Sequence, residues 1–114
     1  MKYLSLDIET FSSENLSKAG VYRYVEAPDF DILLISYAVD GGEVQTIDLA
    51  NGESVPIDLI SAFLSDDVIK WAFNAQFERI CLSEWLKRKG YVLERLVPFG
   101  HEPEYLNYLD PESW

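Results

Sequence analysis

Two carboxylates near the start of the chain, Asp7 and Glu9, stand two residues apart in a segment where apolar and polar residues alternate. Because alternate residues of a β-strand point to the same face, both side chains project together, with Cα atoms roughly 6.5 Å apart. Carboxylates at that separation can share one or two hard cations such as Mg²⁺ or Mn²⁺. Without a cation the two anions repel, and one of them is expected to hold its proton. The spacing alone equally fits two ordinary acids on a solvent-exposed strand face.

A third carboxylate, Glu78, falls in a segment that predicts a helix. Asn74 is typical of a helix N-cap, and the pattern after it predicts a helix to about residue 89. An acid in the first turn is favoured by the helix dipole, which is a sufficient structural reason for Glu78. Its place at the flank of the apolar stripe also allows it to face the sheet edge as a third metal ligand. Asn74 is likewise either a plain N-cap or a ligand contact.

Other familiar catalytic arrangements are absent from the sequence. His101 is the single histidine and Cys81 the single cysteine, so no zinc pair is available. Cys81 falls on an apolar helical stripe, which predicts a buried and inert thiol. Neither Gly-x-Ser-x-Gly nor a phosphate-binding glycine loop is present. The aromatic run at residues 22–24 could stack bases around its arginine, although a half-buried strand explains it as well.

The composition describes one small acidic domain. The chain has 114 residues, with 20 Asp and Glu against 9 Lys and Arg, for a net charge of −11. Modules that bind duplex nucleic acid are usually basic, so this chain does not hold nucleic acid by bulk electrostatics alone. The charge leaves three interpretations: a site that meets phosphates through divalent metals, an acidic piece of a larger protein, or a nucleic-acid mimic.

The sequence also predicts the compartment. No apolar run approaches the ~20 residues needed to span a bilayer, and no membrane partner is expected. An acid follows the start too early for a secretory signal. A single cysteine suits a reducing cytoplasm, which is the expected localisation.

The periodicity predicts an α/β fold. Strands are expected over residues 2–9, 31–39, 43–49 and 68–72, and helices from Pro56 and from Asn74, the first with its buried face on Ile57, Ile60, Phe63 and Leu64. Residues 31–39 are nearly all apolar, typical of a strand buried on both faces. Residues 11–29 are expected to be irregular, with a short extended piece at 21–25. The order predicts a mixed sheet, three antiparallel strands plus a parallel fourth reached by a helical crossover, flanked by helices.

The last part of the chain, about 91–114, is expected to be an irregular tail. It contains three prolines and shows no clear period, and its Tyr105 and Tyr108 are expected to pack. Residues 110–113 are typical of the start of a helix, so we expect residues 1–114 to be a single partial domain truncated at its C-terminus. The surface left by missing helices would be apolar and could support self-association.

Two motifs together resemble a known family. Residues 6–10, Leu-Asp-Ile-Glu-Thr, resemble the first motif of the DEDD 3′–5′ exonucleases, whose fold is ribonuclease H-like. Residues 74–78, Asn-Ala-Gln-Phe-Glu, resemble the second, Asn-x-x-(Phe/Tyr)-Asp. Residues 20–39 look like the phage-type family A DNA polymerases, in which this domain proofreads. The resemblance runs over nearly the whole chain, and the pair of motifs is more specific than either alone.

The resemblance implies roles for these residues. Asp7 and Glu9 would bind the catalytic metal, Asp7 would bridge to a second metal, and Glu78 would hold that second metal through water. Two Mg²⁺ or Mn²⁺ ions would activate a water and stabilise the departing 3′ oxygen of single-stranded DNA. The 3′-terminal nucleotide would be positioned by the Thr10 backbone, Asn74 and Phe77.

Two departures from the family pattern matter. Glu78 stands where the family has Asp, and the extra methylene moves the carboxylate by about 1.5 Å, which is tolerable through a water. The third motif, a Tyr or His four residues before a final Asp, is missing, because Tyr105 and Asp110 are five apart. One metal carboxylate and the residue that orients the water are therefore lacking. We expect the isolated chain to be inactive and its parent protein to be an exonuclease–polymerase.

Two other classes of function stay open. A metal-free structural module with a ribonuclease H-like fold would keep the acids by descent, and Asp7→Asn would then raise stability. A nucleic-acid mimic would need regularly spaced surface acids. Many of the acids instead gather in predicted loops: Glu26, Asp29, Asp31, Asp66, Asp67, Glu102 and Glu104.

Overall fold

Strand β1 (Tyr3–Phe11) is the central element of the computed structural model, which describes residues 1–95 and 97–114. Leu4, Leu6 and Ile8 are buried on one face of the strand, and the alternating residues between them are exposed. This is the period-two pattern that the sequence predicts, with the apolar face turned to the core.

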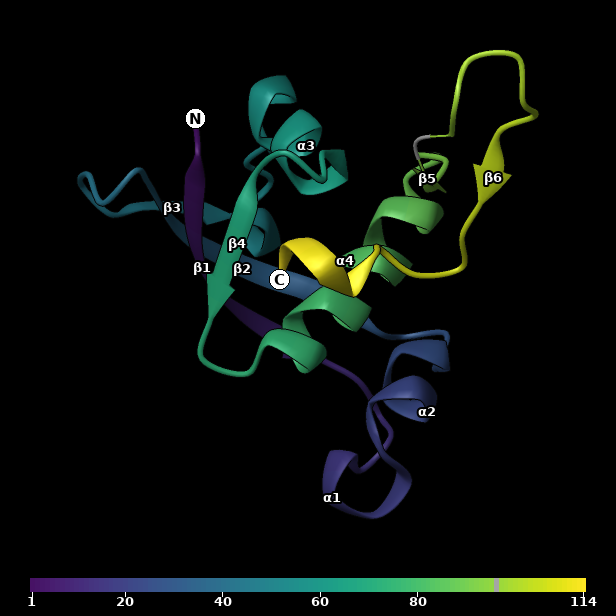
Figure 1. The fold of residues 1–114 in the computed structure, drawn as a ribbon. Helices are drawn as coiled ribbons and strands as arrows, with labels where there is room; N and C mark the ends of the chain where they lie inside the picture. Colours follow the sequence, from purple (N-terminus) through teal and green to yellow (C-terminus); the bar gives the residue numbers. More distant parts are fainter. Residues whose placement is uncertain (96) are drawn as a thin grey trace.

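Four strands form one mixed sheet in the order β3-β2-β1-β4 (Figure 1). β1 pairs antiparallel with β2 (Asp31–Val39), and β2 pairs antiparallel with β3 (Gln45–Asp48). β4 (Ile69–Ala72) lies parallel to β1 on the other side. The predicted mixed sheet, three antiparallel strands and a parallel fourth, is confirmed.

The tight turn after β2 follows from its residues. Asp40 and Gly41 both adopt positive φ angles, 50° and 73°, which Asp and Gly tolerate better than other residues. The Asp40 carboxylate accepts hydrogen bonds of 2.8 Å from the backbone N–H groups of Lys2 and Tyr3, which fixes the start of β1 beside the turn.

Two helices pack on the apolar side of the sheet. α4 (Ala75–Arg88) contacts β1, β2 and β4 and buries Ile80, Cys81 and Trp85, of which Cys81 was predicted to be buried. α3 (Ile57–Leu64) buries Leu59, Ile60, Ala62 and Phe63. Ile57 was expected on this buried face, but it is 73% exposed, because Leu59 and Phe63 set the phase of the helix. A short 3-10 turn, η1 (Leu49–Asn51), follows β3.

The segment before β2 is helical rather than extended. Residues 21–25 were predicted as a short extended piece, but they belong to α2 (Val21–Glu26), which follows α1 (Leu16–Ala19). The prediction failed because Val21 and Val25 are β-branched, a type enriched in strands. Tyr24 and Val25 are nevertheless buried at helical spacing from the half-buried Val21. α2 packs against α4.

The tail contains little regular structure, as predicted. β5 (Glu94–Arg95) and β6 (Glu104–Tyr105) form a two-residue ladder, and the 3-10 turn η2 (Pro111–Ser113) ends the chain. The tail is tied to α4 through Ser83, whose hydroxyl accepts a 2.8 Å hydrogen bond from the Leu109 N–H.

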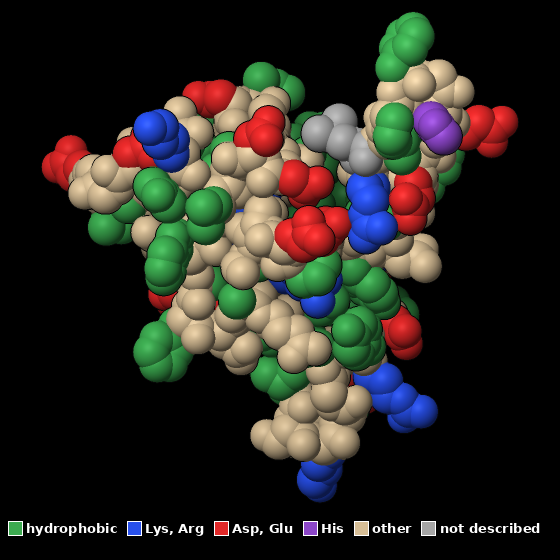
Figure 2. Space-filling view, viewed as in Figure 1, with side chains coloured by type: hydrophobic (Ala, Val, Ile, Leu, Met, Phe, Trp, Pro, Cys, Tyr) green, Lys and Arg blue, Asp and Glu red, His purple; other side chains and the backbone are tan. Residues whose placement is uncertain are grey.

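The second face of the sheet is open. Tyr3, Ile69 and Trp71, on β1 and β4, are exposed large hydrophobic residues, and Leu34 and Ser36 of β2 are only half-buried. Figure 2 shows hydrophobic side chains gathered at the surface where β1, β3 and β4 lie. The expectation that β2 is buried on both faces was therefore wrong for this face, because no helix of the described residues covers it. Within residues 1–95 and 97–114, no helix is long and apolar enough to cross a membrane.

Candidate active site

Asp7 and Glu9 lie together on the open face of β1, and both are exposed. Asp7 pairs with Ser36 of β2, and Glu9 pairs with Leu34. A shallow hollow of about 160 Å³ beside Asp7 is lined by residues of β1, β2 and the loop between β2 and β3. The predicted projection of both carboxylates from one strand face is thus present.

The pairing of β1 with β2 shifts directly after these acids. Glu9 pairs with Leu34, but Thr10 pairs with Ile32, so β2 carries the extra residue Leu33. Such an irregularity increases the local twist and changes the direction of nearby side chains. Here it lies between Glu9 and Thr10. The Thr10 hydroxyl is 2.7 Å from the Tyr24 hydroxyl.

Glu78 is a buried acid in the first turn of α4. Its side chain is 4% exposed, and its Oε2 atom has no hydrogen-bond partner. Burial and, second to it, the negative charge of Asp7 raise the pKa of Glu78 to about 7, while a backbone hydrogen bond from Asn74 acts in the opposite direction. The helix therefore brings Glu78 close enough to Asp7 for the two charges to interact, although they are 71 residues apart in sequence.

Asn74 is the N-cap of α4 by backbone position, but its side chain makes no capping hydrogen bond. Its carbonyl accepts the first helical bond, from the Glu78 N–H at 3.1 Å. The prediction that Asn74 begins the helix is confirmed, while the exposed side-chain amide is left free for another partner. Phe77, in the same turn, is half-buried, and its ring centroid lies 5.9 Å from that of Tyr24.

The carboxylates of this region suit a hard divalent cation. Asp7, Glu9 and Glu78 offer only oxygen donors, which Mg²⁺ and Mn²⁺ prefer. A buried carboxylate oxygen without a partner is costly, and a cation or a cation-bound water would satisfy it. Over the described part of the chain, no group of three or more His, Cys, Asp or Glu side chains is gathered tightly enough to hold a metal. The charge of Asp7 acts on Glu78, and Asp7 and Glu9 both remain exposed along the strand.

The other reactive residues supply no further catalytic group. Cys81 is fully buried in α4, and burial, together with the charge of Glu78, raises its pKa to about 12, as expected for an inert thiol. His101 is exposed in the tail. Of the aromatic run, Tyr22 contacts Tyr108 edge to face, and Tyr24 is buried rather than available for base stacking.

The sequence interpretation missed the part that Tyr24 takes in this region. Tyr24 lies on α2 and joins Thr10, at the end of β1, to Phe77, at the start of α4. The signal that could have found it is the helical spacing of Val21, Tyr24 and Val25, which places both later residues on a buried helix face.

Comparison with known proteins gives one informative similarity. The chain is 57% identical over 84 residues to the DNA polymerase of Bacillus phage SP02. The alignment covers 74% of this chain and 13% of that polymerase, so the chain spans a small part of the relative's length. No family model and no solved structure matches the chain. The identity supports a relationship to a segment of a phage DNA polymerase.

Proposed function

We propose that this chain is the N-terminal part of a 3′–5′ exonuclease domain with a ribonuclease H-like fold, within a phage-type DNA polymerase. The substrate of the complete domain is the 3′ end of single-stranded DNA. Similarity to a phage DNA polymerase supports the polymerase context. A central strand with two acids, beside a helix with a third, supports the exonuclease assignment.

The observation that carries the proposal is the environment of Glu78. An acid is rarely buried without a partner, and here one oxygen is unsatisfied while a second carboxylate, Asp7, lies near enough to raise its pKa. A structural role would favour a paired or neutral side chain at this position. A strongly perturbed carboxyl beside a like charge is typical of a functional site.

The residues divide into two groups. Asp7, Glu9 and Glu78 would hold Mg²⁺ or Mn²⁺, which when bound would supply Lewis-acid activation of water and neutralisation of the phosphate charge. The 3′-terminal nucleotide would lie against the second group. Its members are the Thr10 backbone, the Asn74 side-chain amide, which makes no capping hydrogen bond, and the half-buried Phe77 ring.

Binding of DNA through metal ions is compatible with the negative net charge of the chain. A net charge of −11 repels DNA unless the approach to the acids is neutralised. Divalent cations bound by these carboxylates would attract a phosphate group at the site itself, while the rest of the surface stays negatively charged. The chain therefore needs no basic patch for local contact with a 3′ end.

The test is a Mn²⁺ titration followed by paramagnetic broadening of backbone amide signals in NMR spectra. We expect selective broadening centred on Asp7, Glu9 and Glu78. Glu78→Gln should weaken it. The matched control is Asp58→Asn, since Asp58 is also an acid in the first turn of a helix, α3. It should leave the broadening unchanged.

Uniform weak broadening at millimolar Mn²⁺, or equal effects of the two substitutions, would contradict the metal site. The chain would then be assigned to a structural module that carries the same fold. Competition by Mg²⁺ separates a site for hard cations from adventitious Mn²⁺ at the acidic surface.

A further inference from the structure

We propose that Tyr24 is a positioning residue for this site: it fixes the end of β1 and the first turn of α4 relative to one another, so that Thr10 and Phe77 can hold a nucleotide. This inference rests on the proposed function. Tyr24 is assigned no contact with substrate or metal.

The contacts of Tyr24 reach both segments. Its hydroxyl lies 2.7 Å from the Thr10 Oγ1, and its ring packs on Phe77 and Phe30 with centroid separations of 5.9 Å each. Its carbonyl accepts a 2.7 Å hydrogen bond from the Ser12 hydroxyl. The side chain is 9% exposed, so these bonds are shielded from competition with water.

The hydrogen bond between Thr10 and Tyr24 lies at an irregular point of the sheet. The β1–β2 register shifts between Glu9 and Thr10, so the ladder is irregular where the nucleotide would lie. A side-chain bond at this point can hold the strand end in one direction where the ladder is disrupted. In a site that depends on orientation, displacement of a binding group by about 1 Å weakens function severely.

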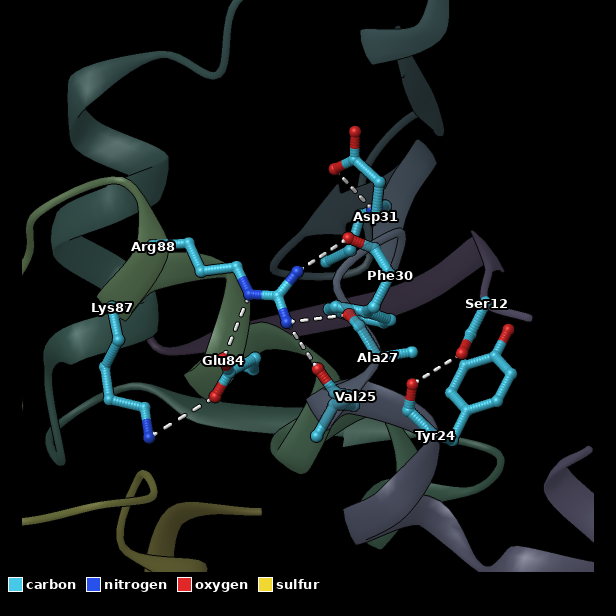
Figure 3. Close-up of polar contacts among 10 residues, drawn as sticks. Ser12, Tyr24, Val25, Ala27, Phe30, Asp31, Glu84, Lys87 and Arg88 are labelled. Carbon is cyan, nitrogen blue, oxygen red and sulfur yellow. Dashed lines mark hydrogen bonds and ion pairs between the residues drawn. The ribbon is translucent and has the colours of Figure 1, made fainter. Parts of the chain in front are cut away.

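Arg88 holds Tyr24 in place from the far end of α4. Its guanidinium donates to the carbonyls of Val25 at 2.8 Å, Ala27 at 3.0 Å and Phe30 at 3.0 Å (Figure 3). Its Nε donates to Glu84 at 3.0 Å, and the charged group lies over the Phe30 ring. These carbonyls belong to the end of α2, where Val25 directly follows Tyr24, and to the turn after the helix. The planar guanidinium fits this set as a lysine could not.

The experiment compares Tyr24→Phe with Tyr22→Phe. The first removes the hydroxyl that bonds to Thr10 and keeps the ring that packs on Phe77. The second removes a hydroxyl from the same helix, on a side chain that is 44% exposed. The probe is thymidine 5′-monophosphate with saturating Mg²⁺, and binding is followed by the NMR shifts of the Thr10 and Phe77 amides. Metal affinity is measured separately with Mn²⁺.

We expect Tyr24→Phe to weaken nucleotide affinity about threefold to tenfold, the effect of one lost neutral hydrogen bond. Mn²⁺ affinity should be unchanged, which a general loss of structure would not allow. Tyr22→Phe should alter neither affinity. Arg88→Lys keeps the charge and should reproduce the selective loss of nucleotide affinity.

Two results would contradict the inference, and they distinguish failure of the positioning role from failure of the proposed function. If the wild-type chain binds the nucleotide and Tyr24→Phe binds it equally well, the positioning role fails and the proposed function stands. If the wild-type chain shows no nucleotide-dependent shifts at Thr10 or Phe77, the proposed nucleotide site fails and the positioning role fails with it.

Discussion

At the scale of single residues, Glu78 carries the most information, because a buried carboxyl with a pKa of about 7 titrates within the physiological range. The unfolded chain releases this proton near pH 4.5 and the folded chain only near pH 7. Between these values the folded state binds more protons, so the contribution to stability is complete at low pH and is lost as pH rises. Glu78 thus weakens the metal-free fold at neutral pH and above.

Glu78→Gln should therefore stabilise the metal-free chain more at high pH than at low pH. Relative to wild type, we expect its free energy of unfolding to gain about 1–3 kcal/mol between pH of about 5 and about 8. Urea denaturation in the presence of a chelator measures this. A difference that does not depend on pH would contradict the burial of an ionisable carboxyl at this position.

Asp7→Asn tests the contact between the two acids. Since the charge of Asp7 contributes to the raised pKa of Glu78, its removal should lower that pKa. The carboxyl carbon shift of Glu78, followed by NMR across the pH range, reports it directly. Glu9→Gln is the control, since it removes an equal charge two residues further along β1. An equal decrease in both variants would show a general effect of net charge.

At the scale of elements, the side chain at the N-cap position of α4 does not cap the helix. An N-cap side chain ordinarily satisfies a free backbone N–H, and its loss costs about 1 kcal/mol. Asn74 makes no such bond. Asn74→Ala should therefore cost less than about 0.5 kcal/mol in thermal or urea unfolding. A loss typical of a working cap would mean that the amide serves the helix rather than a ligand.

Strand β4 is tied to the tail through Lys70, which is 2% exposed. Its Nζ donates to the Ser65 carbonyl and, at 3.1 Å, to the Ser113 hydroxyl. Burial lowers the pKa of Lys70 to about 8, although the charge of Asp66 opposes this. Above pH 8 the unfolded chain binds more protons than the folded chain, so this contribution to stability rises with pH.

Lys70→Met removes that dependence. Between pH of about 7 and about 10, the stability difference should shift in favour of wild type by about 1–3 kcal/mol, as measured by urea denaturation. Lys18→Met, an exposed lysine of α1, controls for the loss of one positive charge. A constant difference across this range would contradict a buried ammonium group in β4.

The sequence predicts an element well when local interactions determine it and poorly when contacts with distant residues do. The alternation around Asp7 is local, so it was predicted from spacing. α2 was misassigned because its β-branched valines are typical of strands, while the contacts of Tyr24 with Thr10 and with α4 come from residues far away in sequence. The register shift at Leu33 and the burial of Glu78 also arise from tertiary packing, which composition does not encode.

At the scale of the whole molecule, the chain presents one closed face and one open face. The helices cover Leu4, Leu6 and Ile8, while the acids lie on the face that exposes Trp71. The sequence predicted a mixed sheet of three antiparallel strands and a parallel fourth, because these directions follow from chain order and connection lengths. It did not predict which face of β2 stays open, since that depends on what packs against the sheet.

The isolated chain should show no degradation of a labelled single-stranded DNA from its 3′ end, in Mg²⁺ or in Mn²⁺. The reason is that a set of catalytic groups acts as a unit, and removing one member abolishes most of the rate. Gel analysis of the products is sufficient. Degradation by the chain that vanished in Asp7→Ala would contradict this and would mean that Asp7, Glu9 and Glu78 suffice.

The hydrogen bonds from Arg88 to the carbonyls around the end of α2 determine when this region can fold during translation. Its carbonyl partners at Val25 and Phe30 precede it by 63 and 58 residues. A ribosome adding about 5–20 residues per second makes Arg88 at least about 3 s after the end of α2. Throughout that interval the α2 carbonyls are without their cation, and Tyr24 has no α4 to pack on. The proposed nucleotide side of the site is therefore completed only after the last turn of α4 has been made.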